Sequence, residues 1–165
     1  MRITEIRTLY DYNYWANARV IRAAGQVQPE QLTRRADVSH GSLLGSLVHV
    51  LSAEWVWRLR CQEGISPPAL LREEDFPTLA DLQRAWAAEE QAMRAYLRGL
   101  SDAALDEKIH YSATSGTPHT STLWHVLVHV VNHGTQFRAE AAVLLTAFGR
   151  SPGNLDFIAF LRKQH

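Results

Sequence analysis

The chain has 165 residues, with 17 Lys and Arg against 17 Asp and Glu, so its formal net charge is zero. A zero net charge argues against a dedicated nucleic-acid-binding protein, which needs a basic face to displace counterions. Hydrophobic residues make up 46% of the chain. This proportion is typical of a globular protein, and the length predicts a single domain over residues 1–165.

A single cysteine, Cys61, excludes an internal disulfide and a Cys-based zinc site. One thiol fits a reducing compartment, so we expect a cytoplasmic protein. The N-terminus lacks the uninterrupted apolar run of a signal peptide, and no segment reaches the roughly 18 apolar residues of a membrane span. We therefore expect no membrane partner.

Helical periodicity dominates the chain and predicts four long helices. Their expected ranges are 4–24, 42–63, 78–99 and 121–148. Thr4 is a candidate N-cap of the first, and Thr78 with Asp81 forms an acidic variant of the capping box at the start of the third. Four long amphipathic helices predict an all-α protein, a four-helix bundle with a short C-terminal helix at 155–162.

The segments between these helices contain the turn-forming residues. Residues 26–41 are expected to form a loop with one helical turn at 30–34, and residues 65–77, with three prolines, a second loop. One further turn is expected at 101–104. Residues 108–120 are rich in Ser, Thr, Gly and Pro, which indicates an extended loop or a short hairpin.

Three of the eight histidines, His125, His129 and His133, are spaced by four in the last long helix. Imidazoles at i and i+4 lie on one helix face and can converge on one metal ion. His49, in the second helix with small residues around it, is the candidate third ligand from a facing helix. Each histidine taken alone is better explained as a core or surface residue of an amphipathic helix, whereas the trio together with His49 favours a site.

Three sequence motifs, in chain order, identify a family. DYNYWANARV resembles the pattern Y-x-x-W-A-N of a first helix, and LVHVLSAEWVWRLR resembles a second helix with a ligand His before Ala-Glu-x-x-Trp. LWHVLVHVVNHGTQFRAEAAVLLTAFG resembles a last long helix with the pattern H-V-V-N-H-G-T-x-H-R-G-Q, and LDFIAFL resembles the family's C-terminal segment. Essentially the whole chain therefore resembles the DinB/YfiT-like superfamily of DNA-damage-inducible helical-bundle proteins.

This resemblance implies a four-helix bundle, commonly a homodimer, with a divalent metal held by three histidines. Two ligand positions correspond to His49 and His133, but the third corresponds to Phe137, which has no lone pair to donate. Three outcomes are open. His129 replaces the missing ligand, or water, a ligand group or a carboxylate such as Glu140 completes the shell, or the ring of Phe137 fills the place of the metal.

Other residues of the motifs have two readings each. Glu54 and Glu140 could act as an acid/base pair only if both face the cavity. Arg138 could bind an anionic group or form a structural salt bridge. Gly134, inside the last helix, either permits a close approach or is simply tolerated there.

Two function hypotheses follow from the resemblance and from the missing ligand. The first is a DinB-like protein with a degenerate metal site at His49, His133 and His129, acting with Zn, Ni or Mn as a thiol S-transferase or hydrolase. The second is a non-catalytic, dimeric, stress-associated bundle that has lost its metal and binds a small molecule. A third, a purely structural bundle, requires a large exposed apolar patch for protein contacts.

Overall fold

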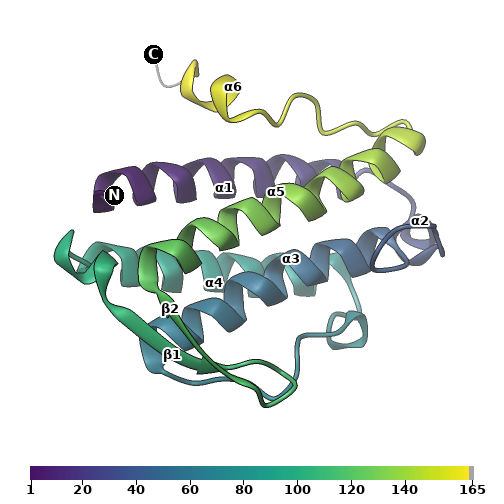
Figure 1. Ribbon diagram of the computed structural model, residues 1–165. Helices are drawn as coiled ribbons and strands as arrows, with labels where there is room; N and C mark the ends of the chain where they lie inside the picture. The colour runs from purple at the N-terminus through teal and green to yellow at the C-terminus, as the bar shows by residue number, and fades with distance from the viewer. Residues whose placement is uncertain (164–165) are drawn as a thin grey trace.

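The computed structural model describes residues 1–163; the last two positions of the predicted domain, including His165, lie outside the described residues. Four long helices form the predicted bundle, and the all-α class is confirmed (Figure 1). They are α1 (Ile3–Ala24), α3 (Leu43–Arg58), α4 (Leu79–Gly99) and α5 (Leu123–Ala147).

The long helices are arranged as a ring in which α5 packs most extensively against α3 and α1, while α4 contacts both α3 and α1. Helix α3 is covered by α5, α4 and the short α2, and its apolar residues accordingly occupy most of its circumference. None of the helices within residues 1–163 is long and apolar enough to cross a membrane.

The predicted helix starts are confirmed for α3 and α4. The Ser42 hydroxyl caps α3 by accepting a hydrogen bond from the Gly45 amide, and Thr78 and Asp81 form the predicted capping box of α4. The predicted N-cap Thr4 is wrong, because α1 begins at Ile3 and the side chain of Glu5 accepts a hydrogen bond from the Arg2 amide instead.

Short elements connect the long helices. The second predicted helix does not run as an α-helix to residue 63, because its last turn widens into a π-helical turn after Arg58. The short elements are α2 (Pro29–Thr33), the π-helical η1 (Leu59–Glu63), the 3₁₀ turns η2 (Glu73–Asp75) and η3 (Ala103–Asp106), and α6 (Phe157–Leu161). Helix α6 is held on α1 by Phe157, whose ring lies 5.2 Å from that of Tyr12.

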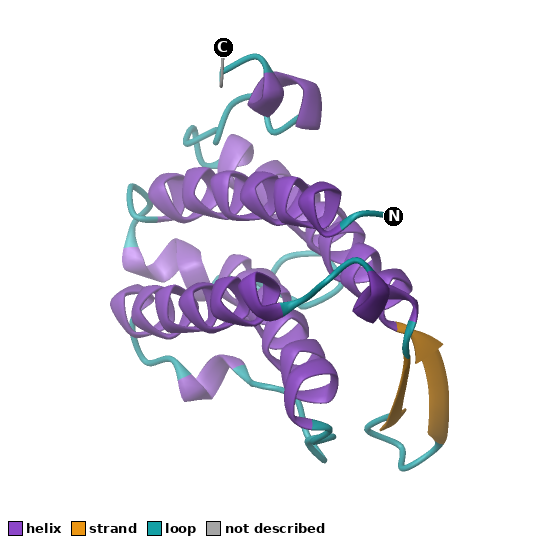
Figure 2. Cartoon of the chain, turned by 90° about the vertical axis from the view of Figure 1, so that its left-hand side faces the viewer, coloured by secondary structure: helices purple, strands orange, loops and turns teal. Residues whose placement is uncertain are grey.

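The segment that the sequence left open between a loop and a hairpin is a hairpin. Strand β1 (Lys108–Ser112) pairs antiparallel with β2 (Pro118–Thr122), with Tyr111 opposite His119. Figure 2 shows this hairpin leaving the bundle just before α5 begins. Strand β2 leads directly into α5, and β1 contacts η1, the turn that follows α3. The hairpin therefore lies near the end of α3.

Candidate functional site

Two of the predicted site residues meet between facing helices. His49 of α3 and His133 of α5 are both half-buried, and their Nε2 atoms lie 3.0 Å apart. A hydrogen bond between two Nε2 atoms needs one ring protonated at Nε2 and the other at Nδ1. Nδ1 of His133 is buried with no hydrogen-bond partner. We therefore assign His133 as the donor, because its Nδ1 then carries no proton that would be left unbonded.

A third imidazole, His40, completes this cluster from the loop before α3. Its ring stacks on that of His49 with centroids 3.6 Å apart. Two features hold the loop there. The amide and hydroxyl of Ser39 donate to the Glu140 carboxylate on α5. A Cβ at Gly45 would lie 2.3 Å from the carbonyl oxygen of His40, so only glycine lets the loop lie this close to α3.

Phe137 fills the place where the family pattern has its third histidine. Its ring centroid lies 4.4 Å from that of His49, 4.5 Å from that of His133 and 5.1 Å from that of His40. The ring therefore contacts all three imidazoles. An aromatic ring can pack against imidazoles in this way but supplies no ligand atom.

The remaining candidate ligand, His129, lies one turn from His133 with ring centroids 5.8 Å apart. Its exposed ring packs against the edge of Trp57 at 5.5 Å. His125 is also exposed and lies against Trp124. The spacing of four therefore places only His133 of this trio in direct contact with His49.

A cavity of about 210 Å³ lies beside the imidazole pair. Helix α3, η1, the hairpin turn and α5 all contribute to it. His49, Trp57, Arg60, Thr114, His129 and His133 are among its lining residues. The cavity combines aromatic and apolar walls with three imidazoles and one guanidinium group, which is the composition of a small-molecule site.

Burial keeps the imidazoles neutral. Desolvation, together with the neighbouring histidines, lowers the pKa of both His49 and His133 to about 4. Burial also lowers the pKa of His40 and of His129. At neutral pH the cluster therefore offers uncharged donors and acceptors rather than positive charge.

These shifts predict that acid destabilises the fold. The unfolded imidazoles titrate near pH 6.5 and the folded pair near pH 4, so the unfolded chain binds more protons between these values. The free energy of unfolding should be fully retained above about pH 6.5 and fall by about 1–2 kcal/mol on going to pH 5, since both rings are partly solvated. Urea titrations across this range measure the slope. The double variant His49→Gln, His133→Gln should flatten it, and an equal slope in both proteins would contradict the prediction.

The side chains present do not fit a three-histidine metal centre. The position of the third ligand carries Phe137, and within residues 1–163 no three His, Cys, Asp or Glu side chains are placed to hold one ion. A ligand histidine usually donates its second N–H to a partner, whereas Nδ1 of His133 has none. Glu140 is engaged by Ser39, which leaves His49 and His133 as a pair of donors bonded to each other.

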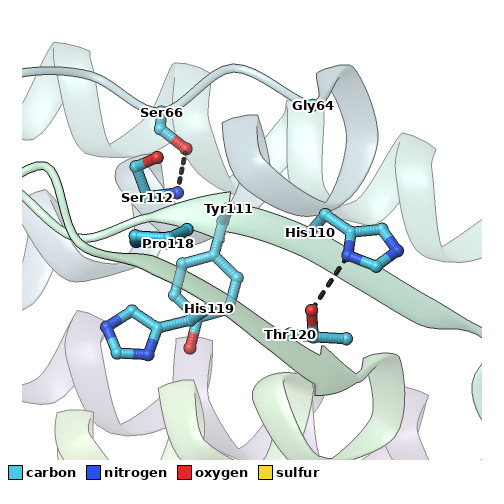
Figure 3. Close-up of a pocket in the computed structure, with 8 residues that line it drawn as sticks. All are labelled: Gly64, Ser66, His110, Tyr111, Ser112, Pro118, His119 and Thr120. Atoms are coloured by element: carbon cyan, nitrogen blue, oxygen red, sulfur yellow. Dashed lines mark hydrogen bonds between the residues drawn. The ribbon is translucent and has the colours of Figure 1, made fainter.

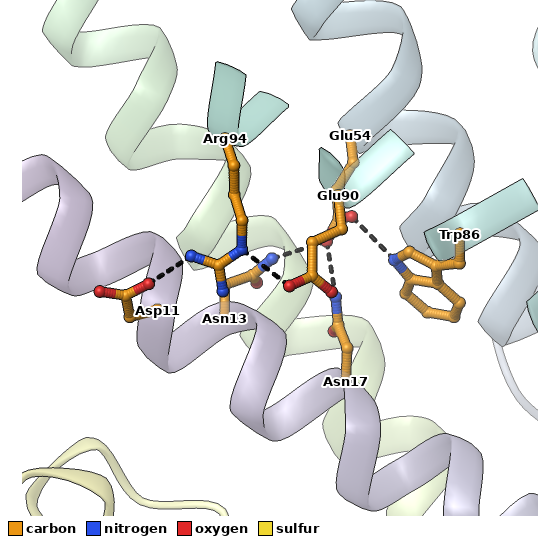
Figure 4. A network of polar contacts seen from close by, with 7 residues as sticks. All are labelled: Asp11, Asn13, Asn17, Glu54, Trp86, Glu90 and Arg94. Carbon is orange, nitrogen blue, oxygen red and sulfur yellow. Dashed lines mark hydrogen bonds and ion pairs between the residues drawn. The ribbon is translucent and has the colours of Figure 1, made fainter. Parts of the chain in front are cut away.

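Glu54 and Glu140 do not form an acid/base pair. Glu54 is 1% exposed and accepts hydrogen bonds at Oε1 from Nδ2 of Asn13 (2.6 Å) and of Asn17 (2.9 Å), and at Oε2 from Nε1 of Trp86 (2.8 Å) (Figure 4). Burial raises the pKa of Glu54, but these three donors favour the carboxylate. The Glu54 carboxylate lies in the packed interior of the bundle and does not line the cavity beside His49.

Arg138 provides the opposite charge of this network. It is 1% exposed, and Nη1 donates to the side-chain oxygens of Asn13 and Asn17, the same two asparagines that donate to Glu54. The two amides thus bridge a buried guanidinium and a buried carboxylate. Of the two readings of Arg138, the structure favours the structural one, although the asparagines replace a direct salt bridge.

Gly134 has a packing role in the same network, and this gives a second prediction. A Cβ at this position would lie 2.6 Å from Nη1 of Arg138 and 2.9 Å from Oδ1 of Asn13. Gly134→Ala should therefore lower the free energy of unfolding by about 1–3 kcal/mol, although alanine is the better helix former by about 1 kcal/mol.

Gly99 is the matched control for this substitution, because a Cβ there meets nothing within 4 Å. Gly99→Ala should leave stability unchanged or raise it by less than about 1 kcal/mol. Urea denaturation of the two variants measures both effects. Equal stability of Gly134→Ala and Gly99→Ala would show that Arg138 and Asn13 can shift to make room for the added methyl group.

A second hollow lies on the hairpin and shares no lining residue with the imidazole cavity. It is open and has a volume of about 640 Å³. His110 and His119 lie along it, and Nδ1 of His110 is hydrogen-bonded to Thr120 (Figure 3). The cavity beside His49 is smaller, but it brings three imidazoles and one guanidinium group together, which makes it the better candidate site.

Comparison with known families matches residues 1–165 to the DinB family. The chain belongs to the DinB family. No curated protein sequence matches it. Membership fits the helical bundle and the position of His49 and His133 on facing helices.

Within this DinB bundle, the site contains residues that the sequence motifs did not single out. His40 lies in a loop without helical periodicity, and only the close approach at Gly45 brings it onto His49. Arg60 follows the last α-helical turn of α3, and its burial depends on the hairpin residues packed over it. Neither feature leaves a periodic signal in the sequence.

Proposed function

We propose that this DinB-family protein binds a small organic molecule in the cavity beside His49 and His133, without a metal centre. One observation carries the proposal: the ring of Phe137 packs on His40, His49 and His133 at the place of the third ligand. His49 and His133 are hydrogen-bonded to each other, and the cavity next to them is lined in part by aromatic and apolar side chains.

The chemistry of the cavity supports binding of an organic molecule. Trp57 and His129 offer ring surfaces, and the neutral pair His49 and His133 can exchange its mutual hydrogen bond for bonds to a ligand. An apolar pocket with a few polar groups is the usual design of such sites.

Metal content is the first test. Untagged protein, purified without a metal column, should hold well below about 0.1 equivalent of Zn, Ni or Mn by plasma mass spectrometry, since two donors do not complete a tetrahedral site. A fragment screen by ligand-observed NMR should then find binders whose affinity is the same with and without EDTA. Near one equivalent of retained metal, or binding that EDTA abolishes, would overturn the proposal.

A second candidate function is the metal-dependent transferase or hydrolase. It is favoured by the direction of the two Nε2 atoms, which point at each other 3.0 Å apart. Two nitrogen ligands of one tetrahedral zinc ion would be separated by about 3.3 Å, given bonds of about 2.0–2.1 Å. The metal measurement above distinguishes this candidate, because it requires a bound ion. The homodimer implied by the family stays a prediction, which sedimentation equilibrium would check.

A further inference from the structure

Arg60 is a buried cation in the wall of the imidazole cavity. The residue belongs to η1 and is 7% exposed. Its guanidinium carbon lies 4.6 Å from the ring centroid of Trp57 and 5.2 Å from that of Tyr111. Nη2 donates to the carbonyl oxygen of Ser112 at 2.9 Å, whereas Nε is buried without a partner.

No acidic side chain within residues 1–163 neutralises Arg60. The titratable groups that act on its charge are Tyr111 and Cys61, neither of which is a carboxylate, and burial lowers the pKa of Arg60. Arg138, the other arginine that is almost fully buried, faces Glu54, and the partly buried Arg58 is paired with Glu63 and Glu89.

An unpaired buried charge is costly to the fold. The two aromatic rings and one carbonyl oxygen around Arg60 recover only part of the hydration that its guanidinium loses. Arg60 packs η1 against the hairpin through Tyr111 and Ser112, but these contacts leave its charge and its Nε donor without an anionic partner, which indicates a functional constraint. An anion bound in the cavity would supply both the missing charge and an acceptor for the free donors.

We propose that the cavity recognises the carboxylate group of a small organic molecule through Arg60, with the neutral imidazoles of His49 and His133 in the same cavity. The proposal rests on the proposed function, because it names the class of ligand for that cavity. All three side chains line the same cavity of about 210 Å³.

Charge and size select a small monocarboxylate. The cavity contains one cation, and its other walls include the apolar side chains of Ala53, Val56 and Leu70, so a single negative charge next to an apolar body is complementary to it. A dianionic phosphate would leave one charge uncompensated. The volume is below the roughly 300–1,000 Å³ of pockets for drug-sized ligands, so the molecule must be small.

Benzoate and benzamide provide the test, because they have the same shape and differ in charge. Binding to the metal-free protein in EDTA is measured by isothermal titration calorimetry and by saturation-transfer NMR. Benzoate should bind roughly 10–100-fold more tightly than benzamide, the ratio expected for one charge-assisted hydrogen bond. Phenyl phosphate should bind more weakly than benzoate.

Arg60→Gln should remove this preference, so that benzoate and benzamide bind equally weakly. Arg98→Gln, which removes the same charge from the exposed surface of α4, should keep it. Arg60→Lys keeps the charge without the planar fork and should retain part of the preference. If Arg60→Gln does not fold, the wild-type comparison of benzoate with benzamide and the Arg60→Lys variant still decide.

The outcomes separate the two proposals. Benzoate binding that is unchanged in Arg60→Gln, or equal affinity for benzoate and benzamide in the wild type, would overturn the role of Arg60 while leaving a metal-free binding cavity. Tighter binding of phenyl phosphate would replace the carboxylate by a phosphate. Failure of every fragment to bind, or a requirement for metal, would overturn the proposed function itself and this inference with it.

Discussion

Replacing Glu54 by alanine is expected to lower the free energy of unfolding by about 3–5 kcal/mol, which is a large part of the stability of a domain of this size. The substitution removes the acceptor of three buried donors, on Asn13, Asn17 and Trp86. It also leaves Arg138, which is 1% exposed, without its counter-charge. Breaking one side of a buried charge network costs more than the network contributes as a whole, because the partner stays desolvated.

Urea denaturation followed by circular dichroism measures this loss. Glu140→Ala is the matched control, since it removes a carboxylate that only binds the amide and hydroxyl of Ser39 near the surface. It should cost about 1 kcal/mol or less. A loss below about 1 kcal/mol for Glu54→Ala would mean that Arg138 finds water or another acceptor, and that the network is not a structural unit.

The bundle could be predicted because helix formation leaves a local signal. The apolar period of 3.6, with the capping box at Thr78, predicts each of the four long helices to within one residue at its start or its end. The change to a π-helical turn after Arg58 could not be predicted in this way, because the apolar period does not distinguish an α-helical from a π-helical turn.

The candidate site was predictable only in part. His49 and His133 could be chosen because they occupy motif positions on two helices that must face each other, and their Nε2 atoms do meet. The contacts of His40 with Phe137 and of Glu54 with Trp86 join residues far apart in sequence. Such contacts depend on how a loop and four helices pack together, and no spacing rule within one segment contains that information.

The same reasoning explains why the three histidines spaced by four do not converge on one point here. Each step of four residues turns the side chain by about 40° around the helix axis. His133 therefore lies on the inner side of α5, while His125, two steps earlier, is exposed to solvent. The residue one turn beyond His133, Phe137, remains directed at the cluster. Position 137, rather than position 129, therefore determines whether a third ligand is available.

Phe137→His should convert the apolar contact into a metal site. The substitution places an imidazole one turn beyond His133, where the present ring lies 4.4 Å from that of His49. After incubation with zinc and desalting, the variant should retain about one equivalent, against a trace for the wild type, because three imidazoles plus water complete a tetrahedral shell. At a free zinc concentration of about 100 times Kd, the bound ion should stabilise the variant by about 2.7 kcal/mol.

Gln136→His is the control for this gain, because it adds an imidazole to the same helix at an exposed position that does not face His49. It should bind no more zinc than the wild type. EDTA should lower the melting temperature of zinc-loaded Phe137→His and leave the melting temperatures of the other two proteins unchanged. Only Phe137→His is stabilised by a bound metal ion that EDTA removes. If Phe137→His stays free of metal, the bundle cannot bring a third imidazole to His49 and His133. The loss of the site would then lie in the backbone packing around His40 and Gly45 as well as in the residue at position 137.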